Sequence, residues 1–339
     1  MPLPDRNSGW TTRTVRVILF VCGLALFGGL VFQIGPTAII SSFSHLSWRL
    51  LIVLCFPFSL VTIFDTLGWR FAFAHDCVSF HVLLRARLAG EAFNATTPTA
   101  SVGGEGVKTW LLRRYVPYEE SLQSVIVAKT TIAISQGLFL LLGIVVASQI
   151  LPLYSPFMRA MQWLLVLEAV AVGGFVLVQL GGGLATIERI LSRLGVLSDR
   201  KGAQTLHRLD GGLSGFYRSQ PRRLLLSIGC HFLGWVLSAL ETYVILRFLD
   251  VPVSLTSATV IEAFGTGIRF ASFLVPAHLG ALEGGHVAIF VALGLEAAAG
   301  LSFSLVRRVR EAAWIGLGFI VLTDRPSRAP NAAISSPEG

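Results

Sequence analysis

Residues 272–284 read SFLVPAHLGALEG, and residues 94–106, in the other half of the chain, read NATTPTASVGGEG. In each stretch a proline precedes a glutamate by seven positions, and glycines surround the glutamate. The pairs are Pro98 with Glu105 and Pro276 with Glu283. Proline cannot donate a backbone hydrogen bond, and glycine adopts conformations that end helices. Each stretch therefore predicts a helix that breaks and restarts near an acidic residue.

The chain around these two stretches is apolar. Of its 339 residues, 53% are hydrophobic and 14% are charged, whereas soluble proteins carry about 25% charged residues. At roughly 20 apolar residues per membrane-spanning helix, there is room for about eight crossings but not for a sizeable extramembrane domain as well. A membrane-tethered soluble enzyme is therefore excluded.

Apolar windows of spanning length predict where the crossings lie. The windows are 17–36, 50–72, 122–150, 160–183, 224–247, 256–275, 284–303 and 309–323, with a weaker, interrupted segment at 86–107. They are continuous and do not alternate with period two, so helices are the backbone solution that lipid allows. The predicted fold is all-α and polytopic, with about eight transmembrane helices and two broken or re-entrant segments in an inverted repeat.

The basic residues predict the orientation. If the N-terminus is cytoplasmic and the segment 86–107 enters and leaves on one side, 19 Lys and Arg residues are cytoplasmic and 6 lie opposite, as the positive-inside rule requires. The first break is then entered from the cytoplasm and the second from the far side. The cluster Arg307, Arg308 and Arg310 falls on the wrong side. Either it faces a cavity or lipid phosphates there, or the parity of the last spans is wrong.

We expect a single transmembrane domain over residues 17–323, with a cytoplasmic N-terminus at 1–16 and a disordered tail at 324–339. The polar stretch 184–223 is expected to be a cytoplasmic amphipathic loop, because its apolar residues recur at helical spacing between arginines. A plain connection and a regulatory segment remain equally open for it.

Nothing in the sequence predicts a metal, a cofactor or a catalytic residue. No cysteine or histidine group has metal-ligand spacing, and P-loop and nucleophile motifs are absent. We interpret the cysteines as small buried hydrophobic residues: Cys22, Cys55, Cys77 and Cys230. The net charge of +8 is assigned to the cytoplasmic membrane face and not to nucleic acid.

Charged residues inside apolar segments form the candidate site, because each would cost about 3 kcal/mol at a helix centre if unpaired. The spacing suggests that Glu105 pairs with Lys108, and Glu262 with Arg269. A helix that restarts beside glycines points free N–H groups into a site, and guanidinium groups clamp a phosphate at two points. The alternative interpretation is that proline and glycine merely kink packed helices. The candidate lipid head-group residues are Asn94, Pro98, Gly103, Gly104, Glu105, Lys108, Arg269, Pro276, Gly280, Glu283, Gly284, Arg307, Arg308 and Arg310.

Two runs resemble the signature segments of the lysylphosphatidylglycerol synthase transmembrane, or flippase-like, family. They are FNATTPTASVGGEGVKTWLLRR at 93–114 and FLVPAHLGALEGGHVAIFVALGL at 273–295. The resemblance extends over about residues 15–323, and SLVRRVREAAWIGLGF at 304–319 resembles the branch associated with hopanoid biosynthesis. The family's motif falls on Asn94, Pro98, Gly103, Gly104, Glu105, Pro276, Gly280, Glu283 and Gly284.

The resemblance implies an integral protein of the inner membrane, related to modules that move aminoacylated or other phospholipids between leaflets. Fused members carry a soluble aminoacyl-transferase domain after the membrane part. Here the chain stops about sixteen residues after the last predicted span, so synthase activity is not expected. The family often has an acidic residue before the basic Lys129, and this chain has Ala128, which weakens any charge pair inferred there.

The leading hypothesis is a lipid translocase or transporter that moves a polar or anionic lipid, a phospholipid or a hopanoid, between leaflets. Two alternatives stay open: an embedded enzyme acting on a lipid head group, with Glu105 or Glu283 as general base, and a non-catalytic scaffold of a lipid-synthesis complex. The expected partners are membrane lipids and lipid-biosynthesis enzymes, with no nucleic acid.

Overall fold

The computed structural model of the chain describes residues 48–96, 103–181 and 200–323. This part of the chain is helical and contains no strand, so the protein is an all-α polytopic membrane protein. Within it, four helices are long and apolar enough to cross a membrane: Leu51–Phe71, Tyr118–Ala147, Pro156–Leu180 and Pro221–Phe248. The predicted first span at 17–36 and the tail at 324–339 lie outside the described residues.

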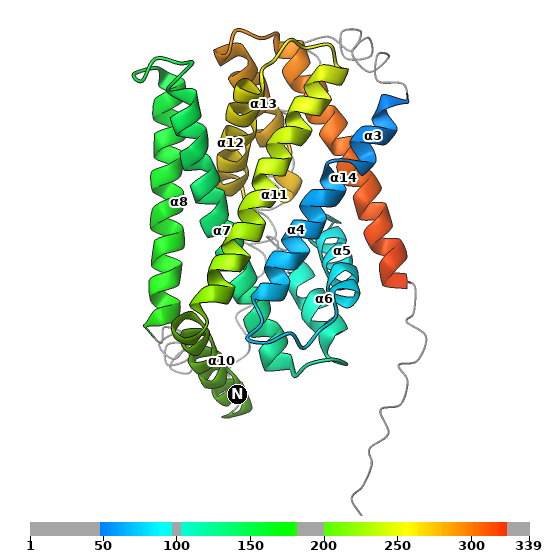
Figure 1. Ribbon diagram of the computed structural model, residues 1–339, viewed down its shortest axis with the longest axis vertical. Helices are drawn as coiled ribbons and strands as arrows, with labels where there is room; N and C mark the ends of the chain where they lie inside the picture. The colour runs from blue at the N-terminus through cyan, green and yellow to red at the C-terminus, as the bar shows by residue number, and fades with distance from the viewer. Residues whose placement is uncertain (1–47, 97–102, 182–199, 324–339) are drawn as a thin grey trace, which may run out of the picture.

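The first half of the chain descends, turns back and rises again (Figure 1). Helices α3 (Arg49–Cys55) and α4 (Phe58–Phe71) lead to the lower end of the view. There α5 (Phe80–Thr96) and α6 (Gly103–Leu112) form a short helical hairpin, which we call the first hairpin. The long helices α7 (Tyr118–Ala147) and α8 (Pro156–Leu180) then run the length of the molecule in opposite directions.

The second half repeats this scheme from the other end. Helix α10 (Arg200–Ser219) lies at the lower end, and α11 (Pro221–Phe248) rises to the top. There α12 (Leu255–Ala271), the 3-10 turn η1 (Pro276–His278) and α13 (Ala281–Ala292) form the second hairpin. Helix α14 (Ala297–Thr323) returns downward, and at 1.5 Å per residue it is about 40 Å long.

The two hairpins occupy opposite halves of the molecule, as the inverted arrangement predicts (Figure 1). The weak segment at 86–107 corresponds to α5 and α6, and the break around Pro98 lies outside the described residues. Helix α5 contacts both η1 and α14. At Gly318 of α14 an added Cβ would lie 2.4 Å from the Leu88 carbonyl oxygen of α5, so glycine permits this close approach.

The last two predicted spans are wrong in their boundaries. The window at 284–303 crosses a turn, because α13 ends at Ala292 and Gly294 takes a positive φ of 74°. Arg307, Arg308 and Arg310 are not in a loop on the far side but in the middle of the continuous helix α14. Three arginines close together lower the hydropathy of a window, and low hydropathy predicts a loop. In the structure, Arg307 and Arg310 are instead buried among carboxylates.

Part of the segment at 184–223 is helical: α10 covers Arg200–Ser219. Its buried apolar residues among 208–219 are Leu209, Leu213 and Phe216, and Gln123 of α7 donates a hydrogen bond to the Gly212 carbonyl oxygen at 2.8 Å. Residues 182–199 lie outside the described part.

The interpretation of the cysteines as buried was wrong for the three that the structure describes. Cys55 is exposed, and Cys77 and Cys230 are half-buried; all three are free thiols. Apolar neighbours in the sequence indicate membrane depth, but they do not say whether a side chain faces the protein or the lipid.

Candidate functional site

The first hairpin closes through backbone contact at its glycines. Gly104 donates its N–H to the Asn94 side-chain oxygen at 2.7 Å, so the end of α5 caps the start of α6. A Cβ at Gly104 would lie 2.0 Å from the carbonyl oxygen of Gly90. The motif residues Asn94 and Gly104 therefore hold the two helices together.

Glu105, in the first turn of α6, is the centre of a shared network. Its Oε1 accepts from Asn94 at 3.2 Å, from Lys108 at 3.1 Å and from Lys129 of α7 at 2.8 Å. Lys108 also reaches Glu91 of α5 at 2.7 Å. The predicted pair of Glu105 with Lys108 is confirmed, and Lys129, whose pairing the sequence made doubtful, is a further partner.

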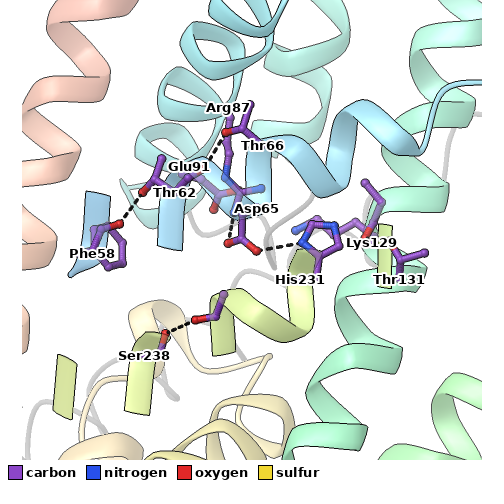
Figure 2. Close-up of polar contacts among 12 residues, drawn as sticks. Phe58, Thr62, Asp65, Thr66, Arg87, Glu91, Lys129, Thr131, His231 and Ser238 are labelled. Atoms are coloured by element: carbon purple, nitrogen blue, oxygen red, sulfur yellow. Dashed lines mark hydrogen bonds and ion pairs between the residues drawn. The ribbon is translucent and has the colours of Figure 1, made fainter. Parts of the chain in front are cut away.

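A second polar group, which the sequence did not single out, lies near this network (Figure 2). Asp65 of α4 accepts from Arg87 of α5 at 2.7 Å and faces His231 Nδ1 of α11 at 2.9 Å. The side chain of His231 is fully buried. An aspartate inside an apolar window was the available signal, because ionisable residues at membrane depth are rare without a partner.

The second hairpin shows its break directly. Ala277, His278 and Gly280 take positive φ values of 52°, 53° and 76°, directly after Pro276 starts η1. The N–H of Gly280 donates to Glu283 Oε2 at 2.7 Å. Glu283 therefore caps the N-terminus of α13, where a negative charge is favoured by the helix dipole.

The arginines of α14 pair with carboxylates of three different helices. Arg307 contacts Glu262 of α12 with both terminal nitrogens, one at 3.1 Å. Arg308 donates to Glu283 of α13 at 2.8 Å, and Arg310 pairs with Glu241 of α11.

The expected pairing of Glu262 with Arg269 is wrong. Arg269 instead lies 3.9 Å from Glu311, which also accepts from Arg308 at 3.0 Å. The sequence interpretation missed Glu311, because spacing along one helix says nothing of a partner on another.

A small pocket, with an internal space of about 10 Å³, lies among α12, α13 and α14; we call it the arginine pocket. Buried nitrogens of Arg269 (Nε), Arg308 (Nη2) and Arg310 (Nε) have no hydrogen-bond partner among the described residues. Arg269 and Glu311 are each about one third exposed, at 31% and 34%. The lining residues are Arg269, Leu282, Glu283, His286, Ser304, Arg307, Arg308, Arg310 and Glu311.

The arginine pocket offers the chemistry of an anion site. Guanidinium N–H groups without acceptors are costly when buried, and an anion satisfies them with charge-assisted hydrogen bonds. Of the predicted site residues, the structure brings Arg269, Glu283, Arg307, Arg308 and Arg310 to this pocket. It places Asn94, Gly104, Glu105 and Lys108 in the first hairpin's own network.

The loop between α4 and α5, outside the spans, carries two pKa shifts. A hydrogen bond from Arg223 holds the pKa of Asp76 below its usual value. Burial, and then the Glu120 carboxylate, raise the pKa of the Cys77 thiol to about 11. Among the described residues, His75, Cys77 and Glu120 could together hold a metal ion.

Comparison with known proteins identifies the family. The family model described as the lysylphosphatidylglycerol synthase TM region matches residues 16–317. No curated protein and no solved structure matches the chain. The chain belongs to this family of membrane regions.

Proposed function

We propose, on the premise of this family membership, that the protein is a lipid translocase of the cytoplasmic membrane. It moves a lipid with an anionic head group between leaflets, with its N-terminus on the cytoplasmic side. The observation that carries the proposal is the arginine pocket, where three guanidinium groups have buried N–H donors without partners among the described residues.

The charge arrangement suits transient binding. Arg308 is held by Glu283 at 2.8 Å and by Glu311 at 3.0 Å, and its Nη2 is left over. A phosphate that takes this nitrogen and the Nε of Arg269 is bound without either arginine losing its carboxylate. A phosphate held by only these two donors is bound weakly enough to be released, which transport requires.

The size of the pocket excludes a whole lipid. Its internal space is about 10 Å³, roughly what one water molecule needs, so only part of a head group enters it. The acyl chains then stay in the bilayer. The partly exposed Arg269 and Glu311 give the head group a way in from outside the protein.

The contacts of the two glutamates favour transport over catalysis. Glu283 uses Oε2 for the N–H of Gly280 and Oε1 for Arg308. Oε1 of Glu105 accepts from two lysines and Asn94. A general base needs a lone pair directed at its substrate, whereas both oxygens of Glu283 and Oε1 of Glu105 already accept hydrogen bonds.

The test is leaflet exchange in liposomes. Purified full-length protein is reconstituted with fluorescent phosphatidylglycerol, and the rate at which label becomes accessible to an external quencher is measured. Arg269→Met removes one guanidinium of the pocket, and we expect a loss of about tenfold or more, since hydrogen bonds to charged groups contribute about 1.5–3 kcal/mol. The matched control is Arg159→Met, which removes an exposed arginine of α8.

Two results would overturn the proposal: wild-type vesicles that exchange lipid no faster than empty ones, or equal rates for Arg269→Met and Arg159→Met. Competition with unlabelled lipids then identifies the substrate. A hopanoid that slows exchange of the label more than phosphatidylglycerol does would place the protein in the hopanoid branch.

A further inference from the structure

The group His75, Cys77 and Glu120 lies apart from both hairpin networks. His75 and Cys77 belong to the loop at the lower end of α4 (Figure 1), and Glu120 to the first turn of α7. The Cys77 Sγ atom is 3.4 Å from Glu120 Oε1, and His75 Nε2 is 3.6 Å from the same oxygen. The three ligand atoms all lie within 4.8 Å of one another.

These separations match the edges of a tetrahedral zinc site. Zinc binds sulfur at about 2.3 Å and nitrogen or oxygen at about 2.0 Å. At tetrahedral angles, a sulfur and an oxygen ligand are then about 3.5 Å apart, and a nitrogen and an oxygen ligand about 3.3 Å apart. The two observed distances differ from these by a few tenths of an ångström.

The loop is held in place independently of the three side chains. The Cys77 N–H donates to the His75 carbonyl oxygen at 3.0 Å. Between them, Asp76 accepts from Arg223 at 2.7 Å and lies 3.2 Å from Arg70. This clamp orients His75 and Cys77 before any ion arrives, and such preorganisation favours binding.

We propose that His75, Cys77 and Glu120 form a zinc(II) site that links the α4–α5 loop to the start of α7. The thiolate, imidazole and carboxylate set suits zinc, whereas magnesium and calcium prefer oxygen ligands alone. The three protein ligands leave a fourth position for water. The sequence alone predicts no metal, because one pair of candidate ligands separated by a single residue is a weak signal and the third ligand is 43 residues away.

The test uses the full-length, tag-free protein in detergent, stripped with a chelator and dialysed. Zinc is titrated calorimetrically, and cobalt(II) is used as a spectroscopic probe. We expect one ion per chain at this site and a thiolate-to-cobalt charge-transfer band. Cys77→Ser abolishes the band, and His75→Ala weakens zinc binding by more than about a hundredfold, since even loss of an outer-shell partner costs 10–100-fold.

The matched control is Cys55→Ser, which removes an exposed thiol of α3 and should keep both the band and the affinity. His75 has a side chain that is 71% exposed, so His75→Ala tests the site even if Cys77→Ser fails to fold. Absence of stoichiometric zinc binding by the wild type, or a charge-transfer band and affinity unchanged in His75→Ala, overturns the proposal.

Discussion

The two hairpins hold their glutamates in different ways. In the first, Glu105 is shared by Asn94, Lys108 and Lys129, on three different helices, and none of these side chains has a buried polar atom without a partner. Around the second, Arg307, Arg308 and Arg310 each pair with a carboxylate of a different helix, and Arg308 also contacts Glu311, which Arg269 shares. Arg308 and Arg310 still retain buried nitrogens with no partner among the described residues.

The difference follows from the chemistry of the two cations. A lysine ammonium is a compact charge that several acceptors and donors surround easily, whereas a guanidinium has five N–H donors in a fixed plane. One carboxylate satisfies two of these donors, so a pocket built from arginines keeps N–H donors that have no acceptor. We infer that the first hairpin is a closed structural network and the second a binding site.

The largest loss of stability is expected at the most deeply buried ion pair. Arg310 and Glu241 are both nearly fully buried, so Arg310→Met removes the hydrogen-bonded partner of a buried carboxylate and should lower the free energy of unfolding by about 3–5 kcal/mol. Thermal unfolding in detergent measures this. Adding Glu241→Gln removes the isolated charge and should restore much of the loss. A double variant no more stable than the single one would show that the pair is not exclusive.

The next effect tests the closure of the first hairpin. In Gly104→Ala the new Cβ would lie 2.0 Å from the Gly90 backbone oxygen, and the helices must separate, at about 1–3 kcal/mol. Gly106→Ala is the control in the same helix, because its Cβ meets nothing within 4 Å. If both variants unfold at the same temperature, the α5–α6 contact is not as tight as described.

A smaller loss of stability is expected at Lys129, because Glu105 is shared by several partners. Lys129→Met leaves Glu105 with Lys108 and Asn94, and the Lys129 side chain is 40% exposed. We expect a loss below about 1 kcal/mol in the same unfolding measurement. A loss as large as that of Arg310→Met would contradict the contrast between a shared and an exclusive network.

The smallest effect concerns the loop that leads into the first hairpin. Because Arg223 lowers the pKa of Asp76 in the folded protein, this carboxylate stabilises the fold above its unfolded pKa of about 4, and the contribution is lost as pH falls through the lowered value. Asp76→Asn should cost about 0.5 kcal/mol at pH 7, since the pair is exposed.

The difference in the free energy of unfolding between wild type and Asp76→Asn should therefore become smaller below about pH 4, which is close to the reference pKa of about 3.9 for aspartate. Glu296→Gln, at an exposed position just before α14, is the control for loss of one negative charge. A difference that grows on acidification would mean that the Asp76 pKa is not lowered by folding.

Much of the site could be predicted from the sequence, but the partners could not. The proline, glycine and glutamate pattern predicted the break that the structure shows at Pro276 and Gly280, and the pair of Glu105 with Lys108. Both of these predictions depend on residues that are neighbours within one helical turn or one loop. Glu262 was assigned to Arg269 on the same helix, whereas its partner is Arg307, 45 residues away.

The sequence by itself determined that this chain is a helical membrane protein with a broken helix at Pro276, because hydropathy and backbone limits act over a few residues. The tertiary structure decided which charges meet. Arg310 and Glu241 are 69 residues apart, and Asp65 and His231 are 166 apart. In a low-dielectric interior a buried charge needs a partner, but the packing of the helices decides which one it has.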